Sequence, residues 1–72
     1  MTLFVLYENP RDFPGKFVIR KQVGEVMAEK PILVTPSLVD ALAILPKSAI
    51  LIGRHQGDDP AIKDVWIEKE TV

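Results

Sequence analysis

The stretch that decides the fold is SLVDALAILP, which covers residues 37–46. Ser37 can cap a helix, and Asp40 three positions later completes a pattern similar to a capping box at the positive end of the helix dipole. The apolar residues at 38, 41, 42 and 45 have the spacing of one buried helix face. Pro46 ends the helix. Since Val39, Ala43 and Ile44 make the opposite side apolar too, we expect a short helix that is buried on more than one side.

Stretches typical of β-strands lie on both sides of this helix. They are rich in β-branched and aromatic residues and cover about residues 3–8, 16–23, 32–34, 49–54 and 62–68. The first of them is apolar on both faces, as in a strand that is covered from two sides. Residues 24–30 are expected to form a loop. The resulting order, β-β-β-α-β-β, predicts an α+β fold with a single, mostly antiparallel sheet and one short helix packed on one face.

Alternation along two of these strands predicts which side chains share a face. In the second strand, Arg20 and Lys21 fall on opposite faces. In the last strand, Ile62 and Asp64 are expected to share a face with Trp66. A lone tryptophan more often belongs to the core or to a dimer interface than to a ligand platform.

The composition indicates a folded protein with a small core. The chain has 72 residues, of which 47% are hydrophobic and 26% charged, so we expect one domain over residues 1–72. A core of this size rarely gives much net stability without disulfides, a metal or self-association. Because the chain has no cysteine, disulfides are excluded, and we expect a homodimer.

The charge and the first residues bear on location and partners. A net charge of −1 gives no overall field that would attract nucleic acid or anionic lipid. The apolar run within residues 1–10 has no basic flank and is too short for a signal peptide or a membrane span. We therefore expect a cytoplasmic protein with no membrane association and no cofactor.

Residues 9–15, NPRDFPG, form the first candidate site. Two prolines, an asparagine and a glycine predict a loop with fixed turns. Tyr7, Arg11 and Phe13 are residue types that anchor interfaces, and Trp66 is a fourth candidate for partner binding. The alternative is that Phe13 folds back and covers the end of the hairpin.

Two further sites are alternatives. Nucleic acid could contact a basic set, with Phe17 available for stacking, and the set consists of Lys16, Arg20, Lys21 and Arg54. A weaker alternative is a metal-binding or enzymatic site at His55, Asp58 and Asp59. The sequence around these two aspartates, GDDP, is also favourable turn chemistry, which is the more frequent role for it.

Four segments together carry a resemblance. They are FVLYENPRDFP at 4–14, FVIR at 17–20, GDDPAI at 57–62 and VW at 65–66. The chain resembles a group of short, uncharacterised proteins of bacteria and their phages, over most of its length except residues 23–30. The resemblance implies a free-standing small protein of a bacterial or phage cytoplasm, and it supplies no catalytic residues. The leading hypothesis is a non-enzymatic, homodimeric protein-interaction module that binds another protein through sheet edges or the 9–15 loop.

Overall fold

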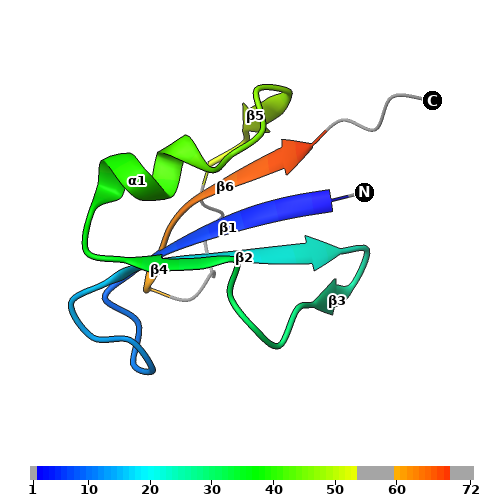
Figure 1. The fold of residues 1–72 in the computed structure, drawn as a ribbon. Helices are drawn as coiled ribbons and strands as arrows, with labels where there is room; N and C mark the ends of the chain where they lie inside the picture. Colours follow the sequence, from blue (N-terminus) through cyan, green and yellow to red (C-terminus); the bar gives the residue numbers. More distant parts are fainter. Residues whose placement is uncertain (1, 54–59, 69–72) are drawn as a thin grey trace.

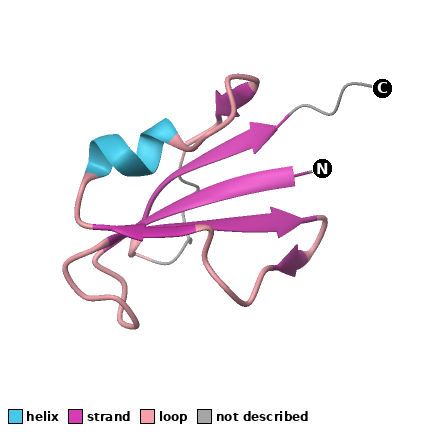
Figure 2. Cartoon of the chain, viewed as in Figure 1, coloured by secondary structure: helices cyan, strands magenta, loops and turns pink. Residues whose placement is uncertain are grey.

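The computed structural model describes residues 2–53 and 60–68, and within them it shows a six-stranded antiparallel sheet with one short helix (Figures 1 and 2). The elements are β1 (Thr2–Glu8), β2 (Phe17–Val23), β3 (Val26–Met27), β4 (Leu33–Thr35), α1 (Leu38–Ala43), β5 (Ala49–Leu51) and β6 (Ile62–Glu68). The helix packs on one face of the sheet. The predicted α+β fold class is therefore confirmed, with one more short strand than expected.

The first strand in the sequence is the centre of the sheet. The order is β3-β2-β1-β6-β5, with β4 also paired to β2. In β1, Thr2 lies opposite Val23 on one side and opposite Glu68 on the other. The first and last strands of the described chain thus lie side by side, as Figure 1 shows.

The helix begins where the sequence predicts. The Ser37 hydroxyl accepts a hydrogen bond from the Asp40 backbone N–H at 3.3 Å, so it caps a free donor of the first turn. The helix ends at Ala43, and the Leu45 N–H then donates to the Leu42 carbonyl. Pro46 explains this early end, because a residue before proline avoids the helical conformation. In the single chain Val39 is 76% exposed, so the chain itself does not bury the second side of the helix.

The core lies between the helix and the sheet. Its buried residues are Phe4, Leu6, Ile19 and Ala41, and the half-buried Phe17, Leu38, Leu45 and Trp66 pack against them. Trp66 thus packs on the core, the first of its two expected places, whereas its role in partner binding stays a prediction. On the sheet face turned away from α1, here called the outer face, Val5, Val18 and Val65 are also buried. On this face of the central strand Leu3 and Tyr7 are only half-buried, so the strand is covered less completely on the outer side than its sequence predicts.

The segment after β2 differs from the prediction of a loop. Gly24, with φ of 59°, lies in a tight turn that brings Val26 opposite Val23 and Met27 opposite Gln22. A glycine that opens a two-residue turn is a common hairpin signal. Farther along, β4 pairs with the other end of β2. Strands β3 and β4 are therefore two pieces of one interrupted strand.

The last strand contains a register shift that the alternation does not reveal. Leu6 lies opposite Asp64, but the next residue, Tyr7, lies opposite Ile62, so Lys63 is an extra residue in β6. A bulge of this kind moves the residues beyond it to the other face. Ile62 therefore lies on the outer face, and the expectation that it shares a face with Trp66 is wrong.

Strand β5 is shorter than the predicted stretch of 49–54. The backbone N–H groups of Ile52 and Gly53 both donate to the Val65 carbonyl, at 2.9 and 3.2 Å. This second bulge ends the regular ladder, and Gly53 adopts a φ of 79°, which favours glycine. Arg54, the last residue of the predicted strand, lies outside the described residues.

Candidate interaction site

The outer face of the sheet carries a shallow apolar groove of about 150 Å³. Of the eight described residues that line it, seven are apolar or aromatic, and the eight are Leu3, Val5, Tyr7, Gln22, Met27, Ile52, Ile62 and Val65. Strands β1, β2, β3 and β6 contribute to it together with Ile52, which follows β5. The groove therefore crosses the sheet, and the bulge at Lys63 is what adds Ile62 to it.

A larger hollow of about 790 Å³ opens beside the groove, at the end of the sheet where β1 leads into the 9–15 loop. Its lining consists of Tyr7, Asn9, Pro10, Arg11, Asp12, Arg20, Pro60 and Ala61. Tyr7 lines both the hollow and the groove. The two depressions thus form a continuous surface, polar at the loop end and apolar over the sheet.

The 9–15 loop is folded by its own hydrogen bonds. Asn9 adopts a φ of 52°, and its side-chain oxygen accepts a hydrogen bond from the Gly15 N–H at 2.7 Å. The Asn9 N–H donates to the Lys16 carbonyl at 2.9 Å and closes the base of the loop. Pro10 is buried against the domain. Asparagine tolerates this left-handed conformation better than most residues, so the loop has a defined shape before any partner binds.

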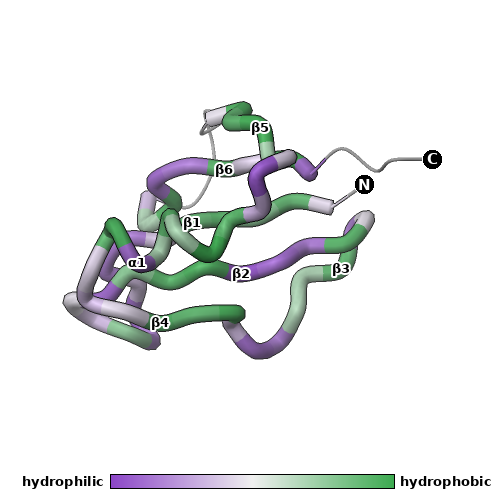
Figure 3. Tube along the Cα trace, turned by 45° about the horizontal axis from the view of Figure 1, so that its top comes forward, coloured by the Kyte–Doolittle hydropathy of each residue, from purple (hydrophilic) through white to green (hydrophobic). Residues whose placement is uncertain are grey.

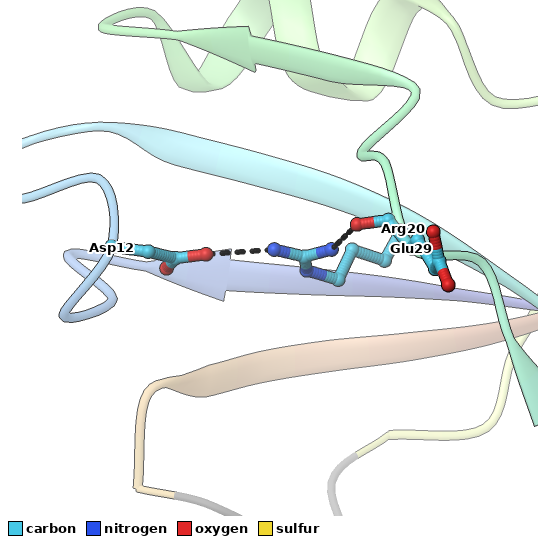
Figure 4. A network of polar contacts seen from close by, with 3 residues as sticks. All are labelled: Asp12, Arg20 and Glu29. Atoms are coloured by element: carbon cyan, nitrogen blue, oxygen red, sulfur yellow. Dashed lines mark hydrogen bonds and ion pairs between the residues drawn. The ribbon is translucent and has the colours of Figure 1, made fainter.

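Arg20 fixes this loop to the sheet. One guanidinium nitrogen, Nη2, lies 2.7 Å from the Asp12 carboxylate, and the other, Nη1, donates to the Glu29 carbonyl at 3.0 Å (Figure 4). The Arg20 side chain is only 18% exposed. A guanidinium can make both bonds at once because its donors form a rigid fork. Arg20 therefore connects the loop, β2 and the segment between β3 and β4.

Of the four predicted partner-binding residues, the structure brings two together. Tyr7 and Arg11 both line the hollow. Phe13 is half-buried in the loop and is not among the lining residues. Trp66 lies opposite Phe4, on the helix side of the sheet. The hollow also contains Asn9, Pro10 and Asp12 of the predicted 9–15 site, and three residues that sequence reasoning did not assign to a protein partner, namely Arg20, Pro60 and Ala61.

Arg11 is the exposed cation of the hollow. Among residues 2–53 and 60–68 it has no hydrogen bond or ion pair, in contrast to Arg20. An uncompensated guanidinium can form two parallel hydrogen bonds with a carboxylate. With Tyr7 beside the apolar groove, the surface offers places for an apolar group and a carboxylate of one partner.

The residues of the nucleic-acid alternative are dispersed. Arg20 lies opposite Val5 on the outer face, whereas Lys21 lies opposite Phe4 on the helix side. Lys16 is exposed beside the loop, and Arg54 lies outside the described residues. Since Arg20 is also paired with Asp12, the described part of the chain does not assemble these side chains into one basic surface.

The metal or enzymatic alternative at His55, Asp58 and Asp59 also lies outside the described residues. Within residues 2–53 and 60–68, no three His, Asp or Glu side chains are grouped so that they could hold a metal ion. Among the described residues that line the hollow, none is a serine, threonine or histidine, which are the common nucleophiles and bases of hydrolytic sites.

Comparisons with known proteins give no further assignment. No protein-family model, curated protein or solved structure matches the chain. Among the described residues, no helix has the length and apolar character needed to cross a membrane.

Proposed function

We propose that this protein is a non-enzymatic, homodimeric interaction module of a bacterial or phage cytoplasm, and that it binds another protein through the hollow and the groove. The observation that carries the proposal is the amount of apolar surface left exposed. Within the described residues, nine large aliphatic side chains are at least 40% exposed, whereas seven hydrophobic residues form the buried core. Apolar side chains exposed singly are common on protein surfaces, but three of these, Ile50, Leu51 and Ile52, are consecutive, and a contiguous exposed apolar patch is typical of interaction sites.

The prefolded loop supports the choice of the hollow as the binding site for a second protein. Binding costs less conformational entropy when the contacting segment is already ordered. The Asn9–Gly15 and Arg20–Asp12 hydrogen bonds hold Arg11 and Tyr7 at the same surface. We infer a partner segment that places an apolar side chain on the groove and an acidic side chain beside Arg11.

The test is affinity purification from the source cell, with a matched pair of charge reversals. Arg11→Glu alters the hollow, whereas Lys21→Glu makes the same type of change on the helix side of the sheet. The proposal expects a protein that the wild type and Lys21→Glu retain and Arg11→Glu loses by at least about tenfold. Equal recovery by Arg11→Glu would contradict the site, and mass spectrometry of the retained protein identifies the partner.

A further inference from the structure

We propose that two copies of this chain pair through strand β5, with the two-fold axis at Leu51, to form one continuous antiparallel sheet. The inference rests on the proposed homodimer and names its surface. Strand β5 is the edge of the sheet beyond β6. Within the described residues no strand pairs with its outer side.

The backbone N–H and C=O groups of β5 point in the directions that this pairing needs. The Ile52 N–H donates inward to Val65, and N–H groups of alternate residues in an antiparallel strand point to opposite sides. Leu51 therefore directs its N–H and C=O outward, away from β6. Two antiparallel copies can exchange both hydrogen bonds between Leu51 and its symmetry mate.

The side chains favour a second copy as the occupant of this edge. Ile50, Leu51 and Ile52 are 54, 57 and 44% exposed, and residues 49–52 include no charge and no proline. With the axis at Leu51, the two Leu51 side chains meet on the helix side, and each Ile50 faces the partner's Ile52 on the outer face. A two-fold contact brings a strand against itself, so an uncharged aliphatic strand meets no repulsion.

The opposite edge shows what a protected edge looks like in the same sheet. There the strand is interrupted between β3 and β4 by Glu29, Lys30 and Pro31. Charges, proline and breaks are the usual means by which proteins prevent edge-to-edge pairing. Figure 3 shows this contrast, hydrophilic between β3 and β4 and hydrophobic over β5.

The exposed area of residues 50–52 limits how tightly two copies can bind through β5. At their observed exposure, Ile50, Leu51 and Ile52 offer on the order of 300 Å² per chain, against about 800 Å² per partner in a standard interface. The total of about 600 Å² is below the roughly 1,000 Å² expected of a stable interface, so we expect weak pairing with a dissociation constant on the order of 100 µM. Measurements should extend to roughly 1 mM chain, well above that constant.

The experiment compares two lysine substitutions by sedimentation velocity of the full chain. Leu51→Lys places two like charges opposite each other at the axis and should weaken dimerisation at least about tenfold. Val26→Lys, at a residue that is 72% exposed on the opposite edge, should leave it unchanged. A wild type that stays monomeric up to roughly 1 mM contradicts both this inference and the proposed homodimer. A dimer that Leu51→Lys leaves intact, or that Val26→Lys disrupts equally, overturns the β5 pairing alone.

Cysteine cross-linking tests the register and does not depend on the lysine variants folding. The chain has no cysteine of its own, so a single Leu51→Cys substitution reports on one contact. A hydrogen-bonded pair has its Cα atoms about 5.5 Å apart, within the range of a disulfide. Leu51→Cys should therefore form a covalent dimer at least about tenfold faster than Ile50→Cys, whose nearest counterpart is offset by two residues. Faster cross-linking of Ile50→Cys overturns the axis at Leu51.

Discussion

At the β3–β4 edge of the sheet the chain is interrupted, charged and tied by Arg20, whereas at the β5 edge three consecutive aliphatic residues are exposed. Both edges belong to the same small sheet and flank strands that contribute to the same core. The Arg20 guanidinium donates to the Glu29 carbonyl, and so it occupies the break between β3 and β4. Strand β5 is short and ends at the bulge of Ile52 and Gly53, but residues 49–52 include no charge and no proline. The charges, the proline and the interruption thus lie at the β3–β4 edge, whereas the uncharged aliphatic strand lies at the β5 edge, which is therefore the edge suited to a neighbouring copy.

The largest change in assembly should come from removing the residues that interrupt the β3–β4 edge. The double substitution Lys30→Val and Pro31→Val makes the segment between β3 and β4 uncharged at these positions and restores a backbone N–H. With two unprotected edges, copies can join head to tail without closing, which produces open-ended assemblies. We expect the mean mass in light scattering to rise several-fold above that of the wild type at equal concentration. Unchanged mass would mean that the interruption has no protective role.

The next effect concerns the residue that ties the protected edge. Arg20→Ala removes the hydrogen bonds to Asp12 and Glu29 and should lower the free energy of unfolding by about 1.5–3 kcal/mol, as for bonds to charged groups. Asp12→Ala removes only one of them, at a carboxylate that is 53% exposed, so its cost should be below about 1 kcal/mol. Urea denaturation of the two variants measures both. A cost for Asp12→Ala equal to that for Arg20→Ala would show that the Glu29 bond contributes nothing.

A smaller effect is expected at the turn that starts the protected edge. Gly24 has a φ of 59°, and a Cβ added there would meet no atom within 4 Å. The cost of Gly24→Ala is therefore conformational, about 1 kcal/mol, and should appear as faster amide exchange in β3. The β5 edge should keep its exchange rates. If two copies pair through β5, amide exchange should be slower in β5 than in β3 both in the wild type and in Gly24→Ala, which serves as the control.

The smallest effect should be that of salt on dimerisation. Residues 49–52 carry no charge, so raising the ionic strength from about 0.05 to 0.5 M should change the dissociation constant by less than about twofold. Sedimentation at both salt concentrations measures this. A strong weakening in salt would indicate that charged residues outside β5 form the contact.

The parts of the fold that depend on local signals were predictable. The capping serine, the helical spacing and Pro46 define α1, and the long strands β1, β2 and β6 agree with their composition. Strand β3 has only two residues, which is too few to show an alternation of apolar and polar side chains. The sequence does contain a hairpin signal there, because Gly24 and one further residue separate Val23 from Val26. The bulge at Lys63 leaves no mark in the sequence because an extra residue does not alter the composition of a strand.

The candidate site was predictable only in part, because residues close in the sequence are easier to place together than residues that the loop conformation brings together. Tyr7 lies near the end of β1 and Arg11 lies four residues later in the loop that follows, so their proximity follows from the chain itself. The pair of Arg20 and Asp12 depends on how the loop returns over the outer face, which is set by Asn9 and Gly15 in left-handed conformations. Sequence reasoning placed Arg20 in a basic set, whereas its charge is compensated within the domain.

The central position of β1 has a consequence for how the protein is made. Its two neighbours are β2, which follows after a short loop, and β6, which ends at residue 68. During synthesis the β1–β2 hairpin can form early, but one side of β1 has no hydrogen-bonding partner until β6 has been translated. Closing a contact between strands so far apart in the sequence is slow compared with forming a hairpin. The nascent chain therefore passes through a stage in which β1 is itself an open edge, and this stage ends only when β6 pairs with it.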